Sequence, residues 1–153
     1  SSLSFSQENN DESTTYVLIR HAEKDNDGTR NPHLSEEGVI RAAGWSEILK
    51  AFEFDAIYST DYFRTKETAK PIADSKALEV LIYDPRAFDI EAFKTKTRGK
   101  KVLIVGHSNT TPANTNKLMG SEKYENLDES IYGNLYIITI QDGKASDMLL
   151  SLK

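Results

Sequence analysis

One apolar run near the start of the chain ends abruptly in two basic residues. Tyr16-Val17-Leu18-Ile19 is followed directly by Arg20 and His21. Four consecutive apolar, mostly β-favouring residues indicate a strand that is covered on both faces, as in a parallel sheet. Ligands of open α/β sheets bind at the carboxyl ends of the strands. We therefore expect Arg20 and His21 to face a pocket, and two side chains that can carry positive charge suit an anion.

Two further stretches also combine an apolar strand pattern with a basic residue just after it. Ala56–Ser59 is typical of a short strand that leads into a helix with Arg64 in its first turn, and Lys101–Gly106 is the strongest buried-strand pattern in the chain, ending at His107. The carboxyl ends of parallel strands meet at one edge of a sheet, so these side chains are expected beside the first pair. From the residues alone, Arg64 could instead pair with Glu67 on a solvated helix face.

In these stretches the chain resembles the histidine phosphatase superfamily, which includes the cofactor-dependent phosphoglycerate mutases. Arg20-His21-Ala22 is similar to the family's Arg-His-Gly signature, with Ala in place of the usual Gly. Ser59–Ala69 is similar to its Ser-x-x-x-x-Arg-x-x-x-Thr-Ala stretch, and Gly106-His107-Ser108 to its late Gly-His pair. The similarity runs from about Tyr16 to the C-terminus. It implies a phosphoglycerate mutase-like fold and phosphatase chemistry.

The chemistry of phosphoryl transfer suits these residue types. Guanidinium groups such as those of Arg20 and Arg64 can each bind two oxygens of a phosphate dianion. His21 is the expected nucleophile, since a neutral imidazole nitrogen can attack phosphorus and form a phosphohistidine. Neighbouring positive charge keeps that ring unprotonated. His107 is expected to hold the transferred oxygens in the transition state. The resemblance implies the same roles for these four residues.

A carboxylate is needed to protonate the leaving oxygen and later to activate water. In the superfamily the position of this group varies, and no tight motif marks it. Asp84, at the expected end of the third strand, is the preferred candidate. The alternatives are Asp89, Glu91 and Glu23, of which Glu23 lies on the nucleophile's own loop. His33 is expected to be a loop residue without a catalytic role.

The remaining periodicity predicts an α/β domain of three layers, α/β/α, with a mainly parallel central sheet and an antiparallel edge strand. Helices are expected at 36–52, 60–71, 90–96 and 110–119, and further strands at 78–83, 134–140 and 148–152, the last two joined by a turn at Asp142-Gly143.

Two of the expected helices have specific end and packing signals. Ser35 is the expected N-cap of the first helix, and the residues predicted to face the sheet are Val39, Ile40, Ala43, Ile48, Leu49 and Phe52. Trp45 is expected to pack rather than to bind a ligand. Thr60 or Asp61 is expected to cap the next helix, and Pro71 to end or kink it.

The length and composition favour one domain. The 153 residues, 38% of them hydrophobic, can build a single sizeable core but not two domains. Residues 1–14 are polar and predict a flexible arm before a histidine phosphatase domain at 15–153. Ser1–Gln7 is consistent with the end of a secretory signal peptide, which predicts a secreted or periplasmic protein; a tail of a cytoplasmic protein is the alternative. No stretch is long and apolar enough to span a membrane.

Charge and residue usage exclude several classes. A net charge of −5 argues against nucleic acid as the partner. The chain has no cysteine, which removes disulfides, thiolate catalysis and zinc–thiolate sites. His21, His33 and His107 show no metal-ligand spacing, so neither a metal nor another cofactor is expected.

The expected activity is hydrolysis of phosphate monoesters. Family mutases carry longer insertions over the pocket than this chain has room for, which favours a hydrolase over a phosphomutase. A non-catalytic phosphate-binding module is a further alternative, but binding alone does not need a nucleophile. The loops at 24–33 and 83–91 are short and polar, which predicts an open pocket for a phosphorylated small molecule or a phosphoprotein. The compact domain also resembles the family's phosphohistidine-protein phosphatases.

Overall fold

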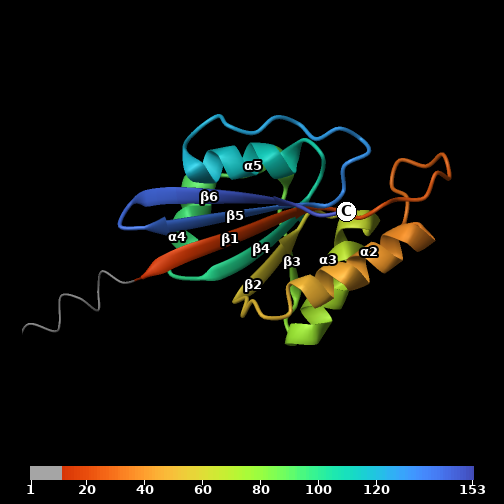
Figure 1. The fold of residues 1–153 in the computed structure, drawn as a ribbon, viewed down its shortest axis with the longest axis horizontal. Helices are drawn as coiled ribbons and strands as arrows, with labels where there is room; N and C mark the ends of the chain where they lie inside the picture. Colours follow the sequence, from red (N-terminus) through yellow and green to blue (C-terminus); the bar gives the residue numbers. More distant parts are fainter. Residues whose placement is uncertain (1–11) are drawn as a thin grey trace, which may run out of the picture.

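The computed structural model describes residues 12–153, which form a six-stranded mixed sheet (Figure 1). The strands are β1 (Ser13–Arg20), β2 (Ala56–Ser59), β3 (Val80–Ile82), β4 (Lys101–Gly106), β5 (Asn134–Gln141) and β6 (Lys144–Ser151), in the spatial order β3-β2-β4-β1-β5-β6. The first four in this order are parallel, and the C-terminal hairpin of β5 and β6 adds the antiparallel edge. This confirms the predicted fold class.

Helices cover both faces of the sheet. They are α2 (Glu36–Ile48), α3 (Phe63–Lys76), α4 (Ile90–Lys96) and α5 (Thr110–Met119). Trp45 of α2 and Ile72 of α3 share one hydrophobic cluster with the sheet, whereas Phe93 of α4 and Leu118 of α5 share the cluster on the opposite face. The domain therefore has three layers, with one large hydrophobic cluster on each face of the sheet.

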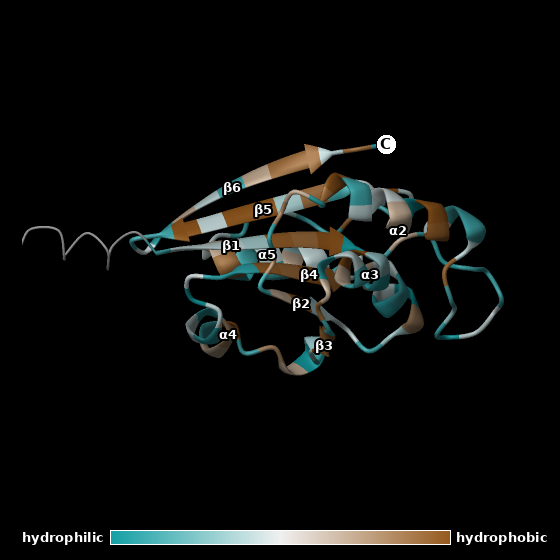
Figure 2. Ribbon diagram, turned by 90° about the horizontal axis from the view of Figure 1, so that it is seen from below, coloured by the Kyte–Doolittle hydropathy of each residue, from teal (hydrophilic) through white to brown (hydrophobic). Residues whose placement is uncertain are grey.

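The central position of β1 explains its apolar sequence. β1 lies between β4 and β5, and all four residues from Tyr16 to Ile19 are 0% exposed. Val17 and Ile19 pack into the α2/α3 cluster, and Tyr16 and Leu18 into the α4/α5 cluster. The apolar half of β1 is the half nearest its carboxyl end, as Figure 2 shows. Buried on both faces, this strand needs apolar side chains at every position.

The register of the parallel strands brings three strand ends to one place. Arg20 pairs with Gly106 across β1 and β4, and Ser59 pairs with Val105 across β2 and β4. The pairing continues for one residue past β1, since the His21 backbone N–H donates to the Gly106 carbonyl oxygen at 2.8 Å. The residues that follow β1, β2 and β4 therefore share one edge of the sheet.

The predicted packing face of α2 was partly wrong. Val39, Ile40 and Ile48 are 58%, 73% and 49% exposed, and Ala43 is also exposed. The helix ends at Ile48 instead of near residue 52, although Ser35 caps it as predicted, through the Gly38 N–H.

The buried stripe of α2 is instead Gly38, Ala42, Trp45 and Leu49, the last of which follows the helix directly. A Cβ on Gly38 would lie 2.0 Å from the Glu23 carbonyl oxygen, so the helix approaches the loop after β1 at a residue without a side chain. This close approach sets the rotation of the helix, which apolar periodicity alone could not indicate.

The start and end of α3 also differ from expectation. Tyr62, rather than Thr60 or Asp61, occupies the N-cap position, and it makes no side-chain capping bond. The Thr60 hydroxyl is engaged elsewhere, with Thr65 and His107, and Asp61 pairs with Lys66. Pro71 lies inside a helix that continues to Lys76.

The structure describes only part of the segment that was predicted to be an N-terminal arm. Ser13 and Thr14, which were assigned to a flexible arm, belong to β1 and pair with Gln141 and Ile140 of β5. Residues 1–11 of the predicted arm, including the segment at 1–7 that resembles the end of a signal peptide, lie outside the described residues. Within residues 12–153, none of the helices has the length and apolar character required to cross a membrane.

Candidate active site

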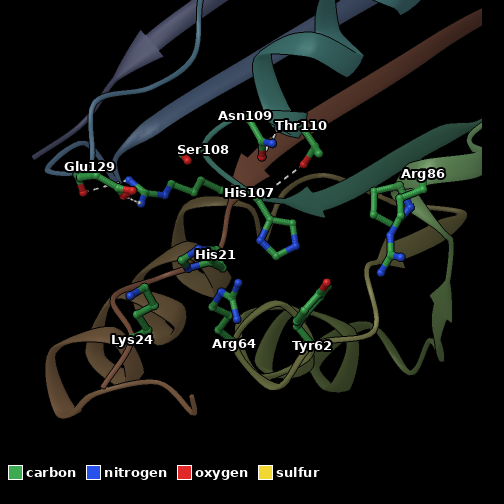
Figure 3. A pocket seen from close by; sticks show the side chains of 12 residues that line it. His21, Lys24, Tyr62, Arg64, Arg86, His107, Ser108, Asn109, Thr110 and Glu129 are labelled. Atoms are coloured by element: carbon green, nitrogen blue, oxygen red, sulfur yellow. Dashed lines mark hydrogen bonds and ion pairs between the residues drawn. The ribbon is translucent and has the colours of Figure 1, made fainter. Parts of the chain in front are cut away.

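A cavity of about 590 Å³ lies at the carboxyl edge of the parallel strands (Figure 3). Its lining residues are Arg20, His21, Lys24, Tyr62, Arg64, Pro85, Arg86, His107, Ser108, Asn109, Thr110 and Glu129. The four residues singled out at the ends of β1 and β4 and at the start of α3 are thus brought together in one cavity. The tertiary structure joins them from sequence positions up to 87 residues apart, the separation of Arg20 and His107.

The His21 imidazole has a defined tautomer. The ring is 3% exposed, and its Nδ1 lies 2.7 Å from the Ala22 carbonyl oxygen. A carbonyl oxygen can only accept a hydrogen bond, so Nδ1 carries the proton and Nε2 keeps its lone pair. Burial lowers the pKa of His21 to about 3, and the charges of Arg20 and Arg64 act in the same direction against the Ala22 hydrogen bond. The ring is therefore neutral near pH 7.

The Arg20 guanidinium is 2% exposed. Its two edges make different contacts. Its Nη1 donates to the carbonyl oxygens of Ile131 at 2.6 Å, Glu129 at 3.1 Å and Asp128 at 3.4 Å. The Tyr132 ring lies 4.0 Å from its central carbon. Its Nε has no partner within residues 12–153, and its Nη2 contacts the Glu129 carboxylate at 3.3 Å. The Nη1 edge holds a loop, and the Nε/Nη2 edge is the fork that can bind an anion.

Arg64 is the second guanidinium of the cavity. Its Nε and Nη1 are buried and have no hydrogen-bond partner among the described residues, and its central carbon lies 4.8 Å from the centre of the Tyr62 ring. Burial lowers the pKa of Arg64, and the nearby charge of Arg20 adds to this effect. The alternative pairing with Glu67 does not occur, because the Glu67 carboxylate bonds to His33 and to the Leu34 N–H.

His107 is oriented by a chain of hydroxyl groups. The Thr65 hydroxyl donates to the Thr60 carbonyl oxygen at 2.9 Å, and the Thr60 hydroxyl donates to the Thr65 oxygen at 2.9 Å. The Thr60 oxygen can therefore accept from Nε2 of His107, 2.9 Å away. Burial lowers the pKa of His107 to about 4, with the charges of Arg64 and Arg20 contributing. The free ring is uncharged, and a bound anion would favour its protonation.

The residue before His107 must be small. A Cβ on Gly106 would lie 2.8 Å from Oγ1 of Thr110 and 3.1 Å from Oγ1 of Thr111. The hydroxyl of Thr110 is needed there, because it accepts from the His107 backbone N–H at 2.9 Å. The Gly-His pair is therefore a packing requirement of the turn between β4 and α5.

The structure places all four predicted proton-donor candidates outside the cavity. Asp84 begins a short 3₁₀ helix (Pro85–Ala87), where its Oδ1 accepts from the Arg86 N–H at 2.9 Å. Asp89 caps α4, and Glu91 lines a hollow at the opposite edge of the sheet. Glu23 forms an ion pair with Arg41, with an O–N distance of 2.8 Å. Asp84 follows two residues after the end of β3 at Ile82, and it lines an adjoining hollow that shares Tyr62, Pro85 and Arg86 with the cavity.

Sequence reasoning missed part of the cavity wall. No role was assigned to residues 121–133, an irregular segment that supplies the Glu129 carboxylate and the Tyr132 ring. Nothing in that stretch separates Glu129 from an ordinary surface acid. Lys24 and Arg86 come from the two loops that were expected to border the pocket. His33 stacks on Phe63 and does not line the cavity.

No group of three or more metal-ligating side chains occurs in the part of the chain that the structure describes. The His21 and His107 ring centres lie 5.5 Å apart, and the rings meet edge to face.

Comparison with known proteins links both the sequence and the fold to phosphatases. Residues 16–87 match the family described as the histidine phosphatase superfamily (branch 1). Phosphoserine phosphatase 1 of Hydrogenobacter thermophilus is 38% identical over 74 residues, which cover 44% of this chain. The matched stretch spans only 35% of that relative's length.

Two solved structures show how far the fold is shared. The mycobacterial glucosyl-3-phosphoglycerate phosphatase superposes with a TM-score of 0.74 at 14% identity, covering 92% of this chain and 100% of the other. The phosphoglycerate mutase of Bacillus anthracis gives a TM-score of 0.68 at 18% identity, covering 95% of each chain. The protein therefore has the phosphoglycerate mutase-like α/β fold. Residues 16–87, slightly less than half of the chain, thus match the histidine phosphatase superfamily in sequence, and the described domain shares its fold with the two solved structures.

Proposed function

We propose that the protein is a phosphatase that hydrolyses phosphate monoesters through a phosphohistidine on His21. The observation that carries the proposal is a neutral imidazole beside two guanidinium groups, in which Nε of Arg20 and Nε and Nη1 of Arg64 have no partner within residues 12–153. Buried donors without acceptors cost free energy, and an oxyanion would satisfy them. Binding alone would not require the exposed lone pair of His21.

The geometry supports a specific first step. Substrate oxygens bind the Nε/Nη2 edge of Arg20 and the free N–H groups of Arg64. Nε2 of His21 then attacks phosphorus, the bond to the leaving oxygen breaks, and the two guanidinium groups stabilise the charge on the equatorial oxygens. Low local polarity strengthens these interactions because the guanidinium groups are partly or fully removed from water.

His107 contributes the third phosphate contact in this proposal. Its Nε2–H is committed to Thr60, which leaves Nδ1 for the ligand. Nδ1 of a neutral ring in this tautomer has no hydrogen to donate, so His107 must take up a proton when the dianion binds. The opposite charge of the phosphate favours this uptake.

The cavity rim suggests the substrate class. Lys24 and Arg86 are exposed cations that line the cavity in addition to the buried arginines. They favour a phosphorylated small molecule that carries a second acidic group, and the name of the phosphoserine phosphatase relative is compatible with a small substrate. A phosphoprotein is the second candidate, since the exposed rim can also be reached by a phosphorylated side chain.

The test is hydrolysis of p-nitrophenyl phosphate in the presence of a metal chelator, with wild type, His21→Ala and His33→Ala compared. Wild type and His33→Ala, whose ring lies outside the cavity, should have the same rate. His21→Ala should be slower by about a thousandfold or more, equivalent to roughly 4 kcal/mol. Quenching in alkaline detergent should trap a base-stable, acid-labile phosphoenzyme in wild type and in His33→Ala, but not in His21→Ala. An active His21→Ala variant, or a wild type that turns over without forming a phosphoenzyme, would overturn the proposal.

A further inference from the structure

Glu129 is the only acidic side chain lining the active-site cavity within residues 12–153. Its side chain is 82% exposed, and it reaches the buried Arg20 guanidinium with an Oε2–Nη2 distance of 3.3 Å. Figure 3 shows the Glu129 side chain at one end of the cavity. The carboxylate thus contacts a donor that a substrate oxygen would also use.

The backbone of Glu129 is held firmly, although its side chain is exposed. The turn from Asp128 to Ile131 is closed by the Ile131 N–H, which donates to the Asp128 carbonyl oxygen at 3.0 Å. The Asp128 carboxylate accepts from both the N–H and the hydroxyl of Ser130. Arg20 Nη1 then binds three carbonyl oxygens of this turn. The Glu129 Cα is therefore fixed relative to the residue next to the nucleophile, while the carboxylate is free to move.

We propose that Glu129 is the catalytic proton donor and acceptor of this phosphatase. The inference rests on the proposed function and adds the group that the reaction needs and that no predicted candidate supplies. Asp84 and Asp89 are turn and helix caps, and Glu23 is bound by Arg41. Glu129 alone combines a carboxylate, a place on the cavity wall and a side chain that can turn.

The contact between Glu129 and Arg20 links substrate binding to the release of the Glu129 carboxylate. In the free protein Arg20 pairs with the carboxylate. A substrate phosphate competes for Nη2 and so displaces the carboxylate, which can then turn toward the leaving oxygen. The released Glu129 then carries a proton next to the bound phosphate ester.

The two chemical steps balance with this single carboxyl group. In the first, Nε2 of His21 forms a bond to phosphorus, the ester P–O bond breaks, and the leaving oxygen takes the proton of Glu129 to give an alcohol. In the second, the Glu129 carboxylate takes a proton from water, whose oxygen bonds to phosphorus. The N–P bond breaks, its electron pair returns to Nε2, and hydrogen phosphate leaves. Glu129 is again protonated, as at the start of the first step.

The experiment compares Glu129→Gln with wild type on two substrates that share the phosphate but differ in the leaving group. Phenyl phosphate has a poor leaving group that needs a proton, and 2,4-dinitrophenyl phosphate has a good one that does not. The variant should lose about a hundredfold or more in kcat/KM on phenyl phosphate, the usual contribution of a general acid. On 2,4-dinitrophenyl phosphate, kcat/KM should change by less than about threefold.

A second readout tests the role of Glu129 as a base. With 2,4-dinitrophenyl phosphate, Glu129→Gln should release a burst of dinitrophenol and then turn over slowly, because activation of water becomes limiting. Asp84→Asn is the matched control, a carboxylate-to-amide change just outside the cavity, and it should match wild type on both substrates.

Three outcomes would overturn the inference. Equal losses on both substrates would mean that Glu129 only positions Arg20. Unchanged rates on both would remove it from the reaction. A loss confined to phenyl phosphate in Asp84→Asn would assign the proton transfer to Asp84. None of these results bears on the proposal that His21 forms a phosphohistidine. That proposal would be contradicted separately, by an active His21→Ala variant.

Discussion

Nδ1 of His21 lies 2.7 Å from the carbonyl oxygen of Ala22, the next residue in the chain. The bond holds the ring tautomer and its direction through the backbone. Ala22 is itself fixed, because it is 0% exposed and its N–H donates to the Thr68 hydroxyl at 2.9 Å. The proposed nucleophile is thus oriented by β1 and by α3 together, and its Nε2 is presented to the cavity without help from a carboxylate.

The first prediction is that replacing Arg64 and replacing Arg20 have different effects on stability. Arg64 donates no hydrogen bond from Nε or Nη1 to residues 12–153, whereas Arg20 holds the turn at 128–131. Arg64→Ala should weaken the binding of vanadate, a phosphate analogue, at least tenfold, or about 1.4 kcal/mol. Its free energy of unfolding should be unchanged or higher, since an unpaired buried charge is removed.

Arg20→Ala should weaken vanadate binding and also destabilise the protein by roughly 2–4 kcal/mol, because three carbonyl oxygens lose their donor. Calorimetric titration and urea unfolding measure the two quantities. Equal stability losses in both variants would contradict the distinction between the two arginines.

The second prediction concerns two glycines of α2. Gly38→Ala places a Cβ 2.0 Å from the Glu23 carbonyl oxygen, whereas a Cβ on Gly44 meets nothing within 4 Å. Gly38→Ala should cost roughly 2–4 kcal/mol of unfolding free energy through backbone displacement. Gly44→Ala should add about 0.5–1 kcal/mol, the usual gain for alanine in a helix. Urea unfolding of the two variants decides whether the close approach sets the position of α2.

The third prediction is a loss of stability in mild acid. The pKa values of His21 and His107 fall from 6.5 to about 3 and about 4 on folding, so above 6.5 both rings are neutral in either state. Below 6.5 the unfolded chain binds protons first, and stability falls as the pH falls toward the folded values. The slope is at most about 1.4 kcal/mol per pH unit for each ring, and smaller for the less buried His107.

Thermal unfolding between about pH 7 and pH 5 measures this effect in a range where few carboxylates titrate. His21→Ala should flatten the dependence of Tm on pH. Identical slopes in wild type and His21→Ala would show that the buried rings do not govern acid stability.

The fourth prediction concerns the cavity rim. Lys24 and Arg86 are exposed, so they should act on substrate binding through screened charge. Lys24→Ala and Arg86→Ala should each raise KM for a phosphorylated carboxylic acid by about three- to fivefold, within the 1 kcal/mol expected of exposed pairs. The value of kcat should not change, and added salt should reduce the difference. Lys94→Ala, at the opposite edge of the sheet, is the control.

Much of the fold and half of the cavity follow from local patterns. An apolar run such as Tyr16–Ile19 shows a buried strand by itself, because a strand covered on both faces excludes polar side chains. The residues after such strands, among them His21 and His107, then reach one edge of the sheet through the parallel topology. Asp84, two residues past the end of β3, lines the adjoining hollow instead of this cavity.

The sequence by itself determined the strand order along the chain, the strand-end histidines and arginines, and the family they indicate. Only the tertiary structure decided which carboxylate enters the cavity and which stripe of α2 is buried. Both depend on contacts between distant segments: Arg20 binds the turn at 128–131, 108 or more residues away, and Gly38 packs on the Glu23 backbone. Such contacts leave no periodic pattern in either segment, since each is specified by the shape and hydrogen-bonding needs of the other.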